Sequence, residues 1–460
     1  MPVTLAFSGY RLPEVHDHIF IGLRGRQDPR RRDISAGRDQ ASGLLKSKAF
    51  VEGVCRYMTG SPSGKQQLSL IRILGSDLLQ QPSLTPDRAL ARAIGESLRS
   101  QSLDGELATR VGPDRFGLLH GSQLDVGQLK EQIVALFRDG DPRSNDLAIE
   151  CASFEIDSEI LRTEEIAKGI VYIINRFKSS DTASALRGIP RSFSKLAEQA
   201  VKAIEGLKGI ISRGDFGVVF QAILDAQTGD IHHYEALARF PASDSLRGPA
   251  EHIALAEEVE LVSEFDLAML GKVVERLAVP TLDSGVKIAV NVSGQSVNCP
   301  AYGADLERVL GENGWLRDRL MFEITESSRI DDLPAANRFV LKLRSSGYAV
   351  CLDDFGAGAA NFQYLASLDV DIIKLDGAAV RCAQRSAKGV AFLKALAGLC
   401  RELGIGTVVE MVDSPESLEF ARACGANYVQ GYLFGKPHAD IGLFERIVPR
   451  DLFRALQPAE

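Results

Sequence analysis

Eight strand-length apolar runs, separated by helix-like segments, occupy the C-terminal half of this 460-residue chain. Strands that alternate with helices indicate parallel pairing, because a parallel partner is reached only through a crossover connection. Eight such units are the number that closes a (β/α)8 barrel of parallel strands. The pattern therefore predicts an α/β chain with a C-terminal TIM-like barrel. The runs cover residues 217–224, 231–240, 286–293, 320–327, 348–354, 371–377, 405–411 and 428–434.

Polar residues stand close to the C-terminal ends of these runs. Inward-facing side chains at the C-terminal ends of barrel strands converge on one face, where barrel enzymes carry their chemistry. One such residue alone means little: Glu235 or Glu323 would be read as an ion-pair partner, and Asn291 as a turn former. The joint arrangement predicts a functional site. Its members are Glu235, Asn291, Glu323, Asp353, Asp354, Lys374, Glu410 and Gln430.

The composition of this face suits divalent cations that prefer oxygen ligands. Four oxygen donors at one depth come from Glu235, Asn291, Glu323 and Asp353. Asp354 could hold a second cation, with Asp353 bridging the two. Two metals roughly 4 Å apart can share a water, lower its pKa and stabilise the entering and leaving oxygens of a displacement. The face therefore predicts a two-metal site.

Two basic residues complete the predicted chemistry. Lys374, placed beside the shared water, could orient the nucleophile or accept its proton, and we expect its pKa to be depressed among cations. Arg239 follows Glu235 by four residues. It is a natural phosphate clamp, because a guanidinium group matches two oxygens at once. The set as a whole favours metal-assisted handling of a phosphate ester.

Composition narrows the class of protein. The chain is 45% hydrophobic and 25% charged, which is typical of a globular protein of two or three domains. No run reaches the 18 or so apolar residues of a membrane span, and we expect no secretory signal at the N-terminus. Seven cysteines without CxxC spacing favour a reducing cytoplasm. The net charge of −8 argues against binding of DNA or RNA.

The rest of the sequence divides into further segments. Residues 1–37 could be the tail of a sensory domain. The basic stretch GRQDPRRRDISAGRD (25–39) at the end of this segment is typical of a solvated linker, with a nucleic-acid contact as the alternative. Residues 38–175 mix helix-like and strand-like patterns and predict a first, smaller α/β domain. Turn formers and small residues dominate residues 176–195, which predicts a linker. The barrel domain then covers residues 196–460.

Residues 196–460 closely resemble the EAL domains, bacterial phosphodiesterases that hydrolyse cyclic di-GMP to linear pGpG with Mg2+ or Mn2+. The matching segments, in the family's order, are FQAILDAQTG, YEALARF, NVS, FEITES, DDFGAG, IKLD, VVEMV and QGYLFGKP. The resemblance implies metal ligation by Glu235, Asn291, Glu323, Asp353, Asp354 and Glu410. It also implies water activation by Lys374, support from Gln430, and ligand contacts from Gln221, Leu237 and Arg239. A homodimer through this domain is implied as well.

The chain departs from the family pattern at two places. The loop that usually reads DDFGTGYSSL is DDFGAGAANF here, so Ala357 lacks a hydroxyl and Ala359 lacks an aromatic ring. In the segment usually written AEGVE, Met411 replaces a glycine and Asp413 replaces a glutamate. No direct metal ligand is lost, and hydrolysis of cyclic di-GMP is the favoured interpretation. The alternative is a receptor that binds cyclic di-GMP but cleaves it slowly.

The first domain resembles a degenerate GGDEF domain, the cyclase module that often precedes EAL domains. The sequence GPDRF (112–116) holds the place of the Gly-Gly-Asp-Glu-Phe turn, so Arg115 stands where an acidic metal ligand is usual. The preceding strand has no aspartate near Ile73, and Leu103 and Glu106 replace the inhibitory RxxD pattern. We therefore expect no cyclase activity. GTP sensing and a structural or dimerising role both stay open for this domain.

Overall fold

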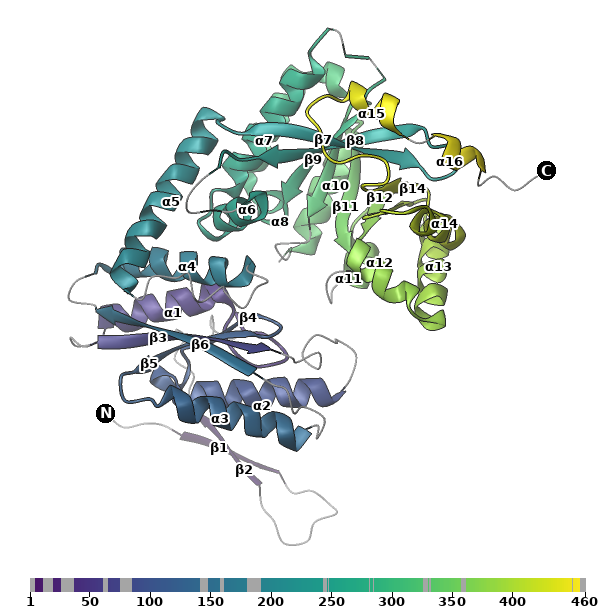
Figure 1. Ribbon diagram of the computed structural model, residues 1–460. Coiled ribbons are helices and arrows are strands. Elements are labelled where there is room, and N and C mark those ends of the chain that lie inside the picture. The colour runs from purple at the N-terminus through teal and green to yellow at the C-terminus, as the bar shows by residue number, and fades with distance from the viewer. Residues whose placement is uncertain are drawn as a thin grey trace. The chain divides into compact units, whose positions relative to one another are not determined.

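The structure is a computed structural model, drawn in Figure 1. It describes residues 5–10, 20–25, 37–60, 65–74, 85–140, 148–157, 161–179, 192–242, 246, 248–280, 282–283, 285–325, 330, 332–356, 361–448 and 450–455. Ala357, Ala359 and most of the basic N-terminal stretch lie outside these ranges. The chain forms two compact units, Met1–Lys202 and Ala203–Glu460. No helix within the described ranges is long and apolar enough to cross a bilayer.

The first unit is built on a four-stranded antiparallel sheet with the order β4-β5-β3-β6. Helices α2 and α3 cover one face of the sheet and α1 and α4 the other (Figure 1). Ile71, Phe116 and Phe137 belong to the apolar core that α2 and α3 close. The main elements are α1 (Ser47–Gly60), β3 (Lys65–Leu74), α2 (Thr85–Gln101), β4 (Ala108–Gly112), β5 (Arg115–Gly121), α3 (Val126–Gly140), β6 (Ala148–Asp157) and α4 (Thr163–Ser179).

Smaller elements complete this unit. Strands β1 (Leu5–Tyr10) and β2 (Phe20–Gly25) pair antiparallel in a separate two-stranded sheet, and η3 (Leu103–Gly105) is a short 3-10 helix. Helix α4 continues to Ser179, so the first part of the segment expected to be a linker is helical. Helix α5 (Phe193–Arg213) begins within that segment too and spans the division between the units.

Arg115 is the first residue of β5, directly after the turn from β4, and is bonded to the end of α4. Its guanidinium donates to the carbonyl oxygen of Phe177 at 2.8 Å and to that of Lys178. A cation is favoured there, because the last carbonyls of a helix carry partial negative charge. The neighbouring Asp114 is paired with Arg72 at 3.2 Å. Arg72 and Arg115 therefore both flank Asp114, the acidic residue of the segment GPDRF (112–116), and disfavour a cation there.

We expect Arg115→Ala to lower the free energy of unfolding of the first unit by about 1.5–3 kcal/mol, the range for hydrogen bonds to charged groups. The carbonyl oxygens at the end of α4 would lose their buried donor. Urea unfolding followed by circular dichroism measures the change. The matched control is Arg92→Ala, because Arg92 is exposed and its ion pair with Glu96 lies at the surface. Equal losses in the two variants would contradict this account.

The second unit is a closed barrel in which the strands follow one another in chain order from β7 to β14. This confirms the predicted TIM-like fold. Neighbouring strands from β8 to β14 pair in parallel. The strands are β7 (Gly217–Asp225), β8 (Ile231–Arg239), β9 (Ile288–Ser293), β10 (Leu320–Thr325), β11 (Ala349–Phe355), β12 (Ile372–Leu375), β13 (Gly406–Val409) and β14 (Tyr428–Gln430).

The first strand shows that the prediction of eight parallel strands was wrong in one respect. Strand β7 pairs antiparallel with both β8 and β14. The connection from β7 to β8 is a tight turn, in which Asp225 accepts hydrogen bonds from the backbone N–H groups of Gln227 and Thr228. Gly229 completes the turn with a φ of 76°. So short a turn joins antiparallel strands, whereas a parallel partner needs a crossover.

Helices fill the remaining connections of the barrel (Figure 1). They begin at or shortly after the C-terminal ends of the strands, so the strand ends carry the loops that surround a site. The helices are α6 (Pro249–Glu258), α7 (Val262–Leu277), α8 (Gly294–Val297), α9 (Pro300–Glu312), η4 (Gly314–Leu316), α10 (Leu333–Ser345), α11 (Asn361–Ser367), α12 (Gly377–Gln384), α13 (Ala387–Glu402), α14 (Pro415–Cys424), α15 (Gly442–Ile447) and α16 (Arg450–Ala455).

Candidate metal centre

Strand alternation separates the barrel interior into an apolar layer and a polar layer. The apolar layer is a cluster of buried side chains, and most of its members precede a predicted site residue by two positions, as Met321 precedes Glu323. Residues two apart on a strand face the same side, so both layers point into the barrel. The apolar cluster consists of Ile223, Ala289, Met321, Cys351, Ile372 and Val408. It forms the floor on which the polar residues stand.

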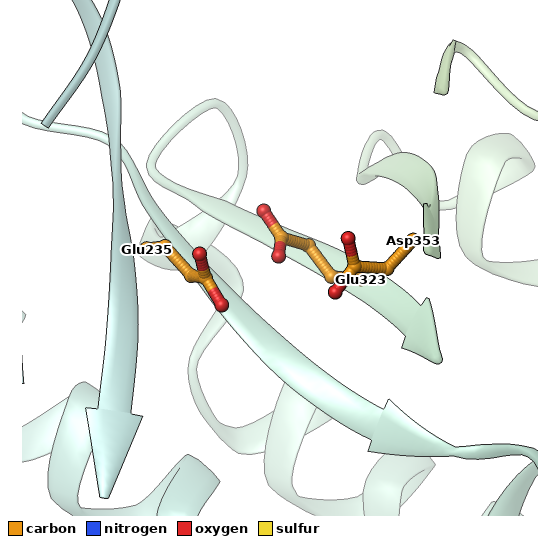
Figure 2. Close-up of side chains that lie close together, drawn as sticks. All are labelled: Glu235, Glu323 and Asp353. Carbon is orange, nitrogen blue, oxygen red and sulfur yellow. The ribbon is translucent and has the colours of Figure 1, made fainter. Parts of the chain in front are cut away.

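Two groups of carboxylates meet in the polar layer. Figure 2 shows Glu235, Glu323 and Asp353 close together on β8, β10 and β11, and one oxygen from each lies within 4.8 Å of the others. Asp353, Asp354 and Glu410 form a second group that meets the same limit. Because Asp353 belongs to both, five carboxylates form one continuous cluster. Carboxylates so close together repel one another strongly unless cations or protons neutralise them.

Lys374 stands at the centre of this cluster. Its side chain is 1% exposed, and its Nζ lies 3.1 Å from oxygens of Glu235, Glu323 and Asp353 and 2.9 Å from Glu410 Oε1. A buried ammonium group is tolerated only when partners of opposite charge surround it. The single positive charge is shared among four carboxylates, so it cannot balance them all.

Two amide side chains donate hydrogen bonds to Glu235, and a third amide bonds to one of them. Asn291 Nδ2 donates to Glu235 Oε1 at 3.0 Å, and Gln430 Nε2 donates to Oε2 at 2.7 Å. Gln430 Nε2 also lies 3.2 Å from Gln221 Oε1, and Gln221 Nε2 donates to the carbonyl oxygen of Gly435. These bonds link β7, β8, β9 and β14 around one carboxylate.

Burial, with repulsion between neighbouring carboxylates, raises the pKa values of most carboxylates in the cluster. Burial raises the pKa of Glu410 to about 8 and that of Asp354 to about 6, and the neighbouring Asp353 adds to both increases. Burial also raises the pKa of Glu323 well above its ordinary value. Burial likewise raises the pKa of Glu235, but Lys374 and the amide donors outweigh it, so the net change is downward.

Lys374 differs from the expectation of a depressed pKa. Burial lowers the pKa of this ammonium group, but the surrounding carboxylates outweigh burial and hold it well above its ordinary value. The expectation assumed bound cations beside Lys374, whereas carboxylates alone surround it here. Without such cations the lysine is protonated and serves as counter-ion to the cluster.

Several buried oxygens in and beside the cluster can still accept a hydrogen bond or bind a cation. Asn291 Oδ1, Glu323 Oε1 and Gln430 Oε1 have no hydrogen-bond partner within the described part of the chain. Buried polar atoms are rarely left this way, because each costs about 1–3 kcal/mol. Oxygen atoms of carboxylates and amides are the ligands that Mg2+ and Mn2+ prefer. The donor set therefore fits divalent cations.

A cavity of about 410 Å³ opens over the cluster. Of the predicted residues, Gln221, Glu235, Leu237, Glu410 and Gln430 line it, together with Arg381, Met411, Asp413, Gly431 and Tyr432. Arg239 is exposed at the end of β8, donates to the carbonyl oxygen of Ala238 at 2.9 Å, and is not part of the lining. A larger cavity of about 520 Å³ lies at the N-terminal ends of the strands, but it contains none of the clustered carboxylates. The smaller cavity therefore gives access to the site.

A histidine in contact with the carboxylate cluster was not foreseen from the sequence, and neither were Arg381, Gly431 and Tyr432 of the cavity wall. His233 precedes Glu235 by two positions and is buried beneath the cluster, with Nε2 3.7 Å from Glu323 Oε1. Its Nδ1 lies 2.7 Å from His232 Nδ1. Burial lowers the pKa of His233 well below its ordinary value, so the ring is neutral. The two-residue spacing from Glu235 was the available signal.

The fold and the acidic cluster define a class of barrel proteins with a carboxylate-rich site. Comparison with known families shows which family of this class the chain belongs to. The model of the EAL domain family matches residues 202–437, and the chain belongs to that family. The uncharacterized protein y4lL of Sinorhizobium fredii is 28% identical over 367 residues, which are 76% of this chain and 43% of that protein. Cyclic di-GMP phosphodiesterase PdeB of Shewanella oneidensis is 29% identical over 433 residues, which are 87% of this chain and 48% of PdeB. The chain thus spans about half the length of these curated relatives.

A solved structure extends the likeness of fold to the first unit. The S helix-GGDEF-EAL structure of LapD from Vibrio cholerae, bound to c-di-GMP, matches with a TM-score of 0.54 at 17% identity. The match covers 86% of this chain and 96% of that one. So wide a match includes the smaller α/β unit as well as the barrel.

We expect Mn2+ or Mg2+ to raise the melting temperature of the protein, because cations that bind only the folded cluster stabilise it, by about 2.7 kcal/mol at 100 times Kd. Glu323→Gln should lose most of this rise, since it removes a charge from the cluster. Differential scanning fluorimetry in metal and in EDTA measures the difference. Glu402→Gln, on the exposed end of α13, is the control. A full metal-dependent rise in the Glu323 variant would argue against the site.

Proposed function

We propose that the second unit is a phosphodiesterase that hydrolyses cyclic di-GMP to linear pGpG with Mg2+ or Mn2+. The observation that carries the proposal is the cluster of five carboxylates around Lys374 beneath an open cavity. Relatives of the chain are named cyclic di-GMP phosphodiesterases, and the LapD structure contains c-di-GMP. In this assignment residues 196–460 are the phosphodiesterase domain and residues 38–175 a degenerate GGDEF domain that binds GTP or serves as a structural or dimerising module.

The charge of the cluster supports two divalent cations. Five carboxylates and one ammonium group sum to −4, which two divalent cations would balance. One cation would be held by the group around Glu235 and Glu323 with Asn291, the other by Asp354 and Glu410, with Asp353 shared. Such cations stabilise charge on phosphate oxygens and lower the pKa of water.

The side chains of the protein do the remaining work. Gln430 and Asn291 keep Glu235 in one orientation through their hydrogen bonds. Gln221 and Leu237 line the cavity wall, where they would contact the dinucleotide. Lys374, once its carboxylate partners are neutralised, is placed to orient the attacking water and take its proton. In this proposal Arg239 turns from its backbone contact to hold a phosphate.

A receptor for cyclic di-GMP is the second candidate, and Met411 favours it. This residue takes a φ of 56°, and its side chain is 50% exposed at the cavity. A side chain that stands where the family has a glycine narrows the entrance and could slow turnover without preventing binding. The carboxylates are all present, which favours the enzyme over the receptor.

Purified protein with Mn2+ should convert cyclic di-GMP to pGpG, as resolved by chromatography, and EDTA should stop the reaction. Glu235→Ala should reduce turnover by at least about a hundredfold, because it removes a cation ligand and the acceptor of three hydrogen bonds. Exposed Glu402→Ala should not. Tight binding of cyclic di-GMP without pGpG would identify a receptor instead. Neither binding nor turnover would refute both candidates. Stimulation by GTP would assign a sensory role to the first unit.

A further inference from the structure

Arg381, in helix α12, is the single basic residue among the described residues that line the cavity. The same wall carries three acidic residues: Glu235 and Glu410, which belong to the cluster, and Asp413, which does not. Among the described residues that line this cavity, the carboxylates repel a dianionic substrate and Arg381 alone attracts it. The guanidinium of Arg381 is therefore the group on this wall that would bind a polyanionic ligand.

Met411 holds this guanidinium at the cavity. Arg381 Nη2 lies 3.6 Å from Met411 Sδ, and its other donors have no partner among the described residues. Arginine has five N–H donors in a planar fork, so most of them are available to a ligand. A thioether is a weak acceptor, and a phosphate would displace it readily. The contact orients Arg381 without neutralising it.

The backbone conformation at Met411 and the space beside Gly377 determine where the Met411 side chain lies. Its φ of 56° is unusual for a residue with a long side chain and costs about 1–2 kcal/mol. Gly377 leaves the space that the side chain fills, since a Cβ atom at 377 would lie 2.4 Å from Met411 Cβ. Strained positions of this kind persist where the surroundings hold them, and they concentrate at ligand sites.

Cyclic di-GMP carries two phosphodiester groups, and hydrolysis to pGpG cleaves one. We propose that Arg381 binds the phosphate that is not cleaved, with Met411 as the positioning residue for its guanidinium. The inference rests on the proposed function, because it takes the carboxylate cluster as the place of cleavage. A guanidinium fork matches two phosphate oxygens and gives a charge-assisted contact that a single-phosphate substrate does not need.

Two substrates separate this role from a general one: cyclic di-GMP, and bis(p-nitrophenyl) phosphate, which has one phosphate. Arg381→Ala should raise KM for cyclic di-GMP about tenfold, as expected for one charged hydrogen-bonding partner, and leave kcat within about twofold. Both constants should stay unchanged for bis(p-nitrophenyl) phosphate. Arg381→Lys should restore part of the affinity. Met411→Ala should raise KM for cyclic di-GMP by a smaller factor. The matched control is Arg385→Ala, because Arg385 is exposed and directly follows α12.

An unchanged KM for cyclic di-GMP in Arg381→Ala would overturn the inference, and so would equal losses on the two substrates. Either result leaves the proposed function intact if the wild type produces pGpG. If the wild type binds but does not cleave, calorimetric Kd values for cyclic di-GMP replace KM, and the same tenfold difference is expected. A wild type that neither binds nor cleaves cyclic di-GMP would remove the proposed function and this inference together.

Discussion

The ion pairs of Lys374 are the interaction on which the rest of the barrel site depends. This one ammonium group, buried inside the barrel, contacts carboxylates that come from β8, β10 and β11 and from the residue after β13. Removing a partner from a buried ion pair commonly costs about 3–5 kcal/mol, because a charge is left without compensation. The cluster therefore ties distant strands to one point. It also leaves the site with more negative charge than one lysine can balance.

The apolar layer beneath the cluster strengthens the interactions between these unbalanced charges. Met321, Cys351 and Val408 close the interior from the N-terminal side and keep water away from the carboxylates. In such surroundings charges interact more strongly than in water. This is why protons remain on Glu410 and Glu323 to higher pH than usual. The same surroundings would strengthen the attraction of any cation that replaces those protons.

Much of this arrangement could be predicted from the sequence. Alternation along short strands determines which residues face inward, and parallel strands end on one face; these two rules bring the clustered carboxylates, Lys374 and the amides together without knowledge of packing. The direction of β7 was missed although the sequence carried a signal for it. The five-residue connection after Asp225 is too short for a helix. The orientation of Arg239 and the contact of Arg381 with Met411 depend on rotamers and on the space at Gly377, which no local pattern specifies.

Two of the unusual residues noted in the sequence, Arg115 and Met411, have opposite physical outcomes. Arg115 in the first unit is buried, and its guanidinium is bonded to backbone carbonyls of α4, so it disfavours a cation at the segment 112–116. Met411 in the barrel is half exposed, and it contacts a guanidinium that keeps free donors. At Arg115, the protein's own guanidinium and carbonyl groups satisfy one another. Met411 alters the wall of a cavity whose carboxylates are intact, so its effect falls on how a ligand is held rather than on whether the site exists.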